Sequence, residues 1–238
     1  MRSGVVLAAT LLSWAACSIT LGDDLLEERT ETFSLEQGGS LSIRNVNGNL
    51  SIEPWDGSVV EVKMAIRGNA NQGIPDGFSA RAAATPSSLV YDVEYPRGSN
   101  NMSVSFVIRV PSEISLETDV ELTNGNITAI GPHIVNLETS NGNISIDGAA
   151  GGEGAETTNG NITASFVGFT DGMRLETVNG SVRASLPADA AFSAETVNGS
   201  VTIEGFSTTT SSRTGVTVRG EPSAKIGTVN GNITVGVI

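Results

Sequence analysis

The sequence predicts an all-β protein whose main body is a single β-solenoid. Three observations support this fold class. The dipeptide Asn-Gly recurs from Asn124 onward at spacings of about 16 to 20 residues, with Thr214-Gly215 as a weaker member of the series. Apolar and polar residues alternate on both sides of each Asn-Gly, as they do in strands. No stretch after Cys17 keeps the 3.6-residue period of a helix.

Each repeat reads as a strand, a turn and a second strand. Around Asn141, apolar residues lie four positions before the Asn and three and five positions after it, at Leu137, Ile144 and Ile146. The positions between them are polar, which is the alternation of a half-buried strand. The Asn side chains are expected to form a structural turn ladder, because stacked amides can hydrogen-bond and both Asn and Gly tolerate a positive φ. This ladder would consist of Asn124, Asn141, Asn159, Asn179, Asn198 and Asn230.

Two architectures are compatible with a strand–turn–strand repeat. Asn-Gly is the preferred sequence of the two-residue type I′ hairpin turn, which would give an antiparallel meander or sandwich. Alternatively, each repeat is one coil of a β-helix-like solenoid, and equivalent strands stack in parallel about 4.8 Å apart. The recurrence of the same residue types at the same offsets favours the solenoid, because stacking gives equivalent positions the same surroundings.

Residues 1–16 are expected to be a signal peptide. Arg2 provides a positive start, and an uncharged apolar run of about 12 residues follows, which is too short for a transmembrane helix of about 20 residues. The small residues before Cys17 resemble a bacterial lipoprotein signal, in which the cysteine is lipidated, although Trp14 stands where Leu is usual. Cleavage by the ordinary signal peptidase is the alternative. Residues 17–32 are acidic and are expected to form a tether.

The remaining residues, 33–238, are expected to form one β-repeat domain. Residues 112–238 hold the regular repeats, and residues 33–111 form a less regular capping half with one further repeat around Asn47-Gly48. The segment 69–88 is rich in Gly, Pro, Ala and Ser and is expected to be a loop. Further strands are expected at residues 59–66, 89–95 and 103–110.

The composition argues against several classes of function. There are 13 Lys and Arg residues against 26 Asp and Glu, a net charge of −13, and the only lysines are Lys63 and Lys225. Nucleic-acid binding needs clustered basic residues, so it is not expected. One Cys and one His exclude an intrachain disulfide and a Cys-based zinc site. We therefore expect no cofactor, no metal site and no catalytic residues.

A column of glutamates, three residues before the Asn of each turn, is the candidate functional face. In a parallel stack these carboxylates would line one exposed row, and neighbours about 5 Å apart repel by roughly 1 kcal/mol in a water-like dielectric. The hypothesis is that the row binds a divalent cation or a basic partner. The alternative is a solvated face that keeps the protein soluble. The column consists of Glu121, Glu138, Glu156, Glu176 and Glu195.

Other residues that could carry chemistry are interpreted as structural. His133 follows Gly-Pro and has no Ser or Cys motif nearby, so it indicates no catalytic dyad. Trp55, Tyr91 and Tyr95 are scattered and are expected to cap the core instead of stacking on sugar rings. The Asn-x-Ser/Thr sequons follow from the repeat itself; they include Asn126, Asn143, Asn161 and Asn198.

Together these motifs resemble a bacterial family of exported β-repeat proteins, catalogued as a domain of unknown function and labelled as candidate adhesins. The resemblance rests on residues 40–53 followed by Trp55-Asp56, on the strand Phe106-Val-Ile-Arg-Val-Pro111, and on the serial Glu-Thr-x-Asn-Gly repeats. It covers residues 33–238. It implies a β-solenoid-like fold and an exported or surface location, and it brings no catalytic residues.

We therefore expect a non-enzymatic protein of the cell envelope or surface, with adhesin-like binding or a role in envelope stress. A structural envelope scaffold is the alternative, and a polysaccharide-acting enzyme is a third, which would need a pair of carboxylates that the even Glu column does not single out. Ser18 after Cys17 resembles an outer-membrane lipoprotein signal; a soluble periplasmic or secreted protein is the alternative. The expected partner is an envelope or surface ligand, with membrane contact only through a lipid anchor.

Overall fold

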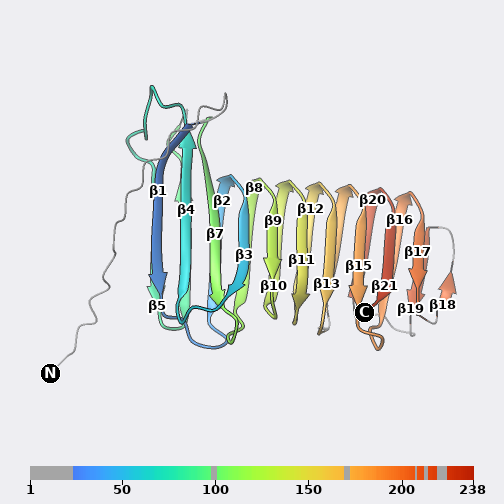
Figure 1. Cartoon of the computed structure of the whole chain (residues 1–238). Helices are drawn as coiled ribbons and strands as arrows, with labels where there is room; N and C mark the ends of the chain where they lie inside the picture. The colour runs from blue at the N-terminus through green and yellow to red at the C-terminus, as the bar shows by residue number, and fades with distance from the viewer. Residues whose placement is uncertain (1–23, 98–100, 169–171, 207, 212–213, 219–223) are drawn as a thin grey trace.

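The described part of the chain folds as β-structure in two facing sheets, as Figure 1 shows. The computed structural model describes residues 24–97, 101–168, 172–206, 208–211, 214–218 and 224–238. These residues form 21 strands, and none of them forms a helix that could cross a lipid bilayer. The predicted all-β class is confirmed.

One sheet contains ten strands. Its central strands pair in parallel, whereas β1 and β4 pair antiparallel with their neighbours at one end. In spatial order the strands are β1 (Asp24–Phe33), β4 (Val60–Gly68), β7 (Ser103–Pro111), β3 (Leu50–Trp55), β9 (Ile127–Ile130), β11 (Ile144–Ala149), β13 (Ile162–Phe166), β15 (Val182–Leu186), β21 (Ile233–Val237) and β17 (Val201–Glu204).

The other sheet contains eleven strands and is also parallel in its centre. Antiparallel pairs close both of its ends. In spatial order the strands are β18 (Thr208–Ser211), β19 (Gly215–Val218), β16 (Phe192–Asn198), β20 (Ala224–Asn230), β14 (Arg174–Asn179), β12 (Gly151–Asn159), β10 (Ile134–Asn141), β8 (Glu117–Asn124), β2 (Ser40–Asn47), β6 (Ser88–Glu94) and β5 (Ser79–Thr85).

Each Asn-Gly turn connects a strand of the eleven-stranded sheet to a strand of the ten-stranded sheet, and we call such a strand–turn–strand unit a coil. Equivalent residues of successive coils align in parallel: Leu137 lies beside Val120 and Ala155, and Ile144 lies beside Ile127. The solenoid prediction is therefore confirmed. The antiparallel meander is wrong for the coils, because the Asn-Gly turn joins two sheets and not two neighbouring strands of one hairpin.

The core lies between the two sheets and is built from inward-facing rows. The residue four positions before each turn Asn is buried along the whole stack, and so are most residues three and five positions after it, because strand side chains alternate between core and solvent. Parallel stacking buries nearly the whole length of each inner row. One such row consists of Ile43, Val120, Leu137, Ala155, Leu175, Ile226 and Ala194.

The N-terminal end is closed by antiparallel strands, and here the structure corrects two predictions. The expected tether, residues 17–32, is β-structure from Asp24 onward, because β1 pairs with β4; residues 17–23 lie outside the described residues. The expected loop, residues 69–88, contains strand β5, which pairs with β6. Neither segment has a clear strand pattern in its sequence. Both form strands because a neighbouring strand supplies hydrogen-bond partners for their backbones.

At the other end the coils do not stack in chain order. Strand β20 lies between β14 and β16, and β21 lies between β15 and β17. The last coil of the chain is thus inserted between the two coils that precede it. The weak repeat at Thr214-Gly215 is not a coil turn, which corrects its place in the series: Gly215 begins β19, which pairs antiparallel with β16.

Candidate functional site

The turn asparagines form a continuous row along one corner of the stack, which we call the turn row. The side-chain Nδ2 of Asn141 donates to Asn124 Oδ1 at 2.9 Å, and Asn159 Nδ2 donates to Asn141 Oδ1 at 2.9 Å. The same bond links every neighbouring pair at 2.8–2.9 Å, because an amide can donate and accept at once. In spatial order the row is Asn47, Asn124, Asn141, Asn159, Asn179, Asn230 and Asn198.

The glycine of each turn is required by close stacking more than by a positive φ. A Cβ on Gly160 would lie 1.9 Å from the carbonyl oxygen of Gly142, and one on Gly142 would lie 1.9 Å from that of Gly125. The expected positive φ is present at Gly48 and Gly125 but at none of the five later turn glycines. That expectation is therefore wrong for most of the stack, because the turn is not a type I′ hairpin.

Buried threonines link the coils beneath the turns. Thr157 Oγ1 donates to the Gly142 carbonyl at 3.0 Å, and Thr177 Oγ1 donates to the Gly160 carbonyl at 2.9 Å. Thr139, Thr196 and Thr228 make the equivalent bond. Each buried hydroxyl therefore has a partner, as burial of a polar group requires.

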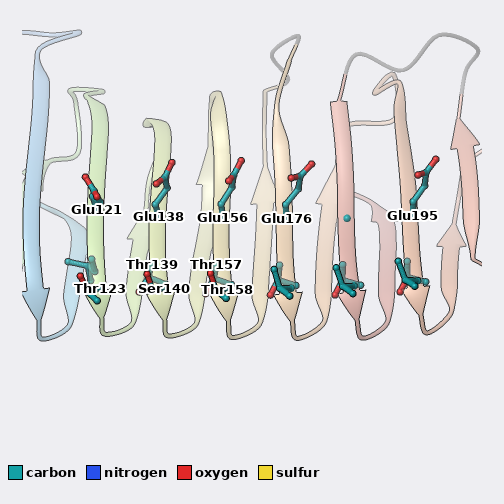
Figure 2. A pocket seen from close by; sticks show the side chains of 18 residues that line it. Glu121, Thr123, Glu138, Thr139, Ser140, Glu156, Thr157, Thr158, Glu176 and Glu195 are labelled. Carbon is teal, nitrogen blue, oxygen red and sulfur yellow. The ribbon is translucent and has the colours of Figure 1, made fainter.

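The predicted glutamate column exists as an outward-facing row, which we call the Glu row. Its strands place Glu121, Glu138, Glu156 and Glu176 side by side, and Figure 2 shows the carboxylates projecting from the sheet in the same direction. The prediction of five adjacent glutamates is wrong at one point. Because the last coil is inserted out of order, Gly227 lies between Glu176 and Glu195.

Neighbouring negative charges make it harder for Glu138, in the middle of the row, to ionise. Burial raises the pKa of the Glu138 carboxyl, and the neighbouring carboxylates, led by Glu156 and Glu121, raise it further. At the N-terminal end of the row, Arg44 lies 3.4 Å from the Glu121 carboxylate. Arg174 lies 3.6 Å from the Glu176 carboxylate, so part of the charge is compensated where a basic residue is near.

A groove of about 570 Å³ runs along the outer face of the eleven-stranded sheet beside this row. The Glu row forms one side. The residues directly before the turn Asn form the other side, with hydroxyls at Thr123, Ser140 and Thr158 and then exposed valines. In spatial order the valines are Val178, Val229 and Val197, which are 41%, 39% and 68% exposed.

Neither the three valines nor Gly227 was among the site residues expected from the sequence. The valine side of the groove was recognisable in principle, because each valine directly precedes a turn Asn. The position of Gly227 in the Glu row was not, since it depends on the inserted coil. Cys17, the candidate lipidation site, lies outside the described residues.

His133 is buried at the corner opposite the turn row. Its Nδ1 accepts a hydrogen bond from the Leu116 N–H at 3.3 Å, and within the described part of the chain its Nε2 has no hydrogen-bond partner. Burial lowers the pKa of His133, although the nearby Ile130 carbonyl opposes this shift. The geometry agrees with a structural role.

The three aromatic residues considered for sugar stacking lie in the capping half. Tyr91 is fully buried and its hydroxyl donates to Glu31 at 2.7 Å. The Tyr95 hydroxyl donates to Asn45 at 2.7 Å, and burial raises the pKa of Tyr95 to about 12. Trp55 is half-buried and donates from Nε1 to the Val59 carbonyl at 3.0 Å. Each polar group is thus used within the fold.

The sequon asparagines also take part in the stack. The Asn126 side chain accepts from the backbone N–H of Asn143 at 2.8 Å, and the Asn143 side chain accepts from that of Asn161 at 2.8 Å. This agrees with the structural interpretation of these asparagines.

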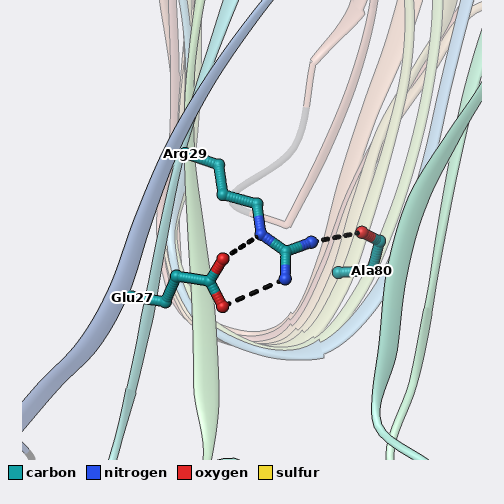
Figure 3. A network of polar contacts seen from close by, with 3 residues as sticks. All are labelled: Glu27, Arg29 and Ala80. Carbon is teal, nitrogen blue, oxygen red and sulfur yellow. Dashed lines mark hydrogen bonds and ion pairs between the residues drawn. The ribbon is translucent and has the colours of Figure 1, made fainter. Parts of the chain in front are cut away.

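The Arg29 cluster is a second group of polar contacts, at the N-terminal end (Figure 3). The Arg29 guanidinium makes a two-pronged contact with the Glu27 carboxylate and donates to the Ala80 carbonyl at 3.4 Å. Glu27 and Arg29 belong to β1 and Ala80 to β5, which are the end strands of the two sheets. The cluster therefore ties the sheets together where the core would otherwise open.

A sequence model of the Toastrack DUF4097 family matches residues 18–236. The chain belongs to this family. The match covers nearly all of the chain and confirms the resemblance to a β-repeat family of unknown function; a Toastrack domain is β-solenoid-like, as observed here. No match is found among the curated proteins.

Three solved structures that are similar to this Toastrack chain come from named bacteria. One is a candidate cell adhesion protein from Clostridium sporogenes, with 12% identity, a TM-score of 0.45 and coverage of 89% of this chain and 99% of the other. A candidate adhesin from Bacteroides fragilis has 12% identity, a TM-score of 0.35 and coverage of 89% and 97%. A candidate lipid-binding protein from Parabacteroides distasonis has 10% identity, a TM-score of 0.25 and coverage of 89% and 96%.

Proposed function

We propose that this Toastrack protein is a non-enzymatic binding protein of the bacterial cell envelope, and that it binds its ligand along the groove beside the Glu row. The observation that supports this most strongly is the continuity of the groove, whose lining residues come from β8, β10, β12, β14, β20 and β16. A groove that crosses so many coils suits an extended ligand better than a compact one.

The chemistry of the groove favours a ligand with repeated positive charge. Successive carboxylates lie one coil apart, about 4.8 Å, and repel one another. A cationic ligand would therefore reduce an electrostatic repulsion that is present in the folded protein. The valine side offers apolar contact to the alkyl stems of basic side chains. We infer that the partner is a basic, extended peptide segment, with divalent cations as weaker competitors.

Calorimetric titration of the whole mature protein with hexalysine tests this proposal. Because the binding is electrostatic, we expect measurable affinity at low salt that weakens as salt is raised. The variant Glu138→Gln/Glu156→Gln should weaken binding by about 5-fold to 150-fold, since charged contacts in a groove are worth about 1–3 kcal/mol together.

The matched control is Asp147→Asn/Glu204→Gln, which removes the same charge from exposed positions of the ten-stranded sheet. It should leave the affinity nearly unchanged. Equal loss in both variants would mean that hexalysine responds only to net charge, and the groove would then not be the site. A second titration with millimolar calcium separates cation binding: a raised Tm that Glu138→Gln abolishes would assign the row to a metal ion instead.

The proposed location is the cell envelope, reached through a signal peptide at residues 1–16 and a lipid on Cys17. The motif at Ala15-Ala16-Cys17 precedes the family match, which begins at residue 18. Metabolic labelling with an alkyne fatty acid, comparing the native chain with Cys17→Ala, tests the anchor. Label on the native chain alone supports a lipoprotein; label on neither would favour a soluble exported protein.

The proposal assigns binding and not catalysis to the groove. Glu121, Glu138, Glu156 and Glu176 follow one another one coil apart. This regular series singles out no pair of carboxyl groups of the kind that glycosidic cleavage uses. Release of reducing sugar from uronate polymers or peptidoglycan by the purified protein would contradict this part of the proposal.

A further inference from the structure

The Asn-Gly pairs of the turn row are prone to spontaneous deamidation, and the hydrogen bonds of the stack oppose this reaction. Asparagine followed by glycine can close a five-membered ring without any enzyme. The backbone nitrogen of the glycine attacks the side-chain Cγ of the asparagine and forms a C–N bond, and the side-chain amide leaves as ammonia. Water then opens the resulting succinimide to aspartate or isoaspartate. Asparagine is one of the heat-labile residues for this reason.

Both reacting groups are held in hydrogen bonds at six of the seven turns. The attacking N–H of the glycine donates to the carbonyl oxygen of the turn Asn in the next coil, as Gly142 does to Asn159 at 3.0 Å and Gly160 does to Asn179 at 3.1 Å. The side-chain Oδ1 of the asparagine accepts from the neighbouring amide, as described for the turn row. The same N–H donor bond is made by Gly48, Gly125, Gly180 and Gly231.

The exception is Asn198-Gly199, in the coil that ends the stack. In the described residues, neither the Gly199 N–H nor Asn198 Oδ1 has a hydrogen-bond partner. Asn198 takes part in the turn row only as a donor, to Asn230 Oδ1 at 2.8 Å. No turn follows it, because the neighbour of β16 on that side is the antiparallel strand β19, which pairs with residues 192–195.

The end coil is also less buried than the others. Val201 and Ile203 are only half-buried, whereas the residues at the same positions of the inserted coil, Ile233 and Val235, are buried. Local opening is easiest where few apolar contacts hold a segment, so the turn at Asn198 reaches the ring-closing conformation at the lowest cost.

We propose that Asn198 is a self-modification site, and that in the folded protein it is converted to aspartate or isoaspartate ahead of the other six turn asparagines. The product places a carboxylate against Asn230 Oδ1, where the Asn198 amide donated before. Two acceptors then face each other, and the end coil of strands β16 and β17 loosens.

The chain contains its own matched control. Residues 176–182 and residues 195–201 have the same sequence, Glu-Thr-Val-Asn-Gly-Ser-Val. Asn179 and Asn198 therefore have identical neighbours along the chain and differ only in their place in the stack. Any difference in their rates comes from the fold and not from the local sequence.

The experiment is incubation of the full mature protein at mildly alkaline pH and 37 °C, followed by peptide mapping with mass spectrometry. We expect Asn198 to gain the mass of deamidation at least about tenfold faster than Asn179, because two hydrogen bonds must open first at Asn179. In urea the two rates should become equal. Equal rates in the folded protein, or faster reaction at Asn179, would overturn the proposal.

A variant tests the structural consequence separately. Asn198→Asp carries the product charge from the start and should lower the Tm to that of protein aged at Asn198. Asn198→Gln reacts far more slowly, since its longer side chain forms a less favourable ring, and its Tm should not change on ageing. An aged native protein with an unchanged Tm would contradict the predicted loosening of the end coil.

Discussion

The turn row and the Glu row run along the same stack with the same spacing, yet their energetics are opposite. Neighbouring asparagines are joined by amide hydrogen bonds of 2.8–2.9 Å over the whole row. Neighbouring glutamates repel, and the pKa of Glu138 is raised as a result of burial and of that repulsion. The turn row has no foreign residue, whereas Arg44 and Gly227 stand within the line of the Glu row.

The difference shows what stacking does to a repeated side chain. A group that both donates and accepts gains a bond from each added coil, and the gain continues along the row. A group that carries only charge adds a repulsion with each coil. A solenoid therefore keeps a charged row only where something other than stability favours it, which is the reason that we place the ligand beside the Glu row.

The largest effect is expected from a side chain at the turn glycines. Gly160→Ala would put a methyl group within 1.9 Å of the Gly142 carbonyl oxygen. We expect the free energy of unfolding to fall by about 3 kcal/mol or more, as for a severe overpacking change. Urea unfolding followed by circular dichroism measures it. The control is Gly236→Ala, which meets no atom within 4 Å; an equal loss there would contradict the steric explanation.

A smaller loss is expected from a gap in the turn row. Asn159→Ala removes one amide bond to Asn141 and one from Asn179, leaving both neighbours short of a partner. The expected loss is about 2 kcal/mol, from two exposed hydrogen bonds at about 1 kcal/mol each. Asn198→Ala removes one such bond and should lose about half as much. If both variants lost the same amount, the row would not act as a connected ladder.

Removing one carboxylate should stabilise the fold slightly. Glu138→Gln is expected to raise the free energy of unfolding at pH 7 by about 0.5 kcal/mol, the size of a cross-strand charge effect. Because the pKa of Glu138 is raised in the folded state, the destabilising contribution of Glu138 is lost as the pH falls through that pKa toward the ordinary value of 4.5. The advantage of Glu138→Gln should therefore disappear at acidic pH.

Urea midpoints of the native chain and Glu138→Gln at pH 7 and pH 4 give this comparison directly. Glu204→Gln serves as the control, since it neutralises an exposed glutamate of the other sheet. A larger gain from Glu204→Gln would mean that net charge, and not the row, sets the cost.

The smallest effect is expected at His133, the single histidine of the chain, and it can be measured without a substitution. Since burial lowers the pKa of His133, its ring signal in an NMR pH titration should have a midpoint below the ordinary 6.5. The unfolded chain binds the proton at higher pH than the folded chain does. The contribution of His133 to stability is thus complete above pH 6.5 and is lost as the pH falls below it. A midpoint at or above 6.5 would contradict the buried, neutral histidine.

The repeat architecture was predictable from the sequence because its signal is redundant. Seven Asn-Gly pairs have apolar residues at the same positions relative to the Asn, and each pair predicts the same coil. The solenoid, the turn row and most of the Glu row therefore follow from aligning the repeats. The N-terminal strands were harder to predict. Strand β1 is acidic and β5 is rich in alanine, and both are strands because a neighbouring strand offers hydrogen bonds.

The stacking order was not predictable, because the last three coils are too similar in sequence to specify their neighbours. Three consecutive coils share nearly the same turn sequence, Thr-Val-Asn-Gly-[Asn/Ser]-[Ile/Val], around Asn179, Asn198 and Asn230. Each can pair with either of the others through the same rows, so local sequence does not specify which coil is the neighbour. The interruption of the Glu row by Gly227, and the exposure of Asn198 at the end, both follow from this choice of order.

The inserted coil also makes the stacking order depend on strands that come late in the chain. A ribosome delivers the N-terminal part first, so β16 and β17 are made before the strands that lie between them and the rest of the stack. Before residues 224–237 are made, β14 and β15 do not yet have β20 and β21 as neighbours. A strand edge without a neighbour is open to pairing with another strand or another chain. The observed stacking order is therefore reached only after β20 and β21 have been made.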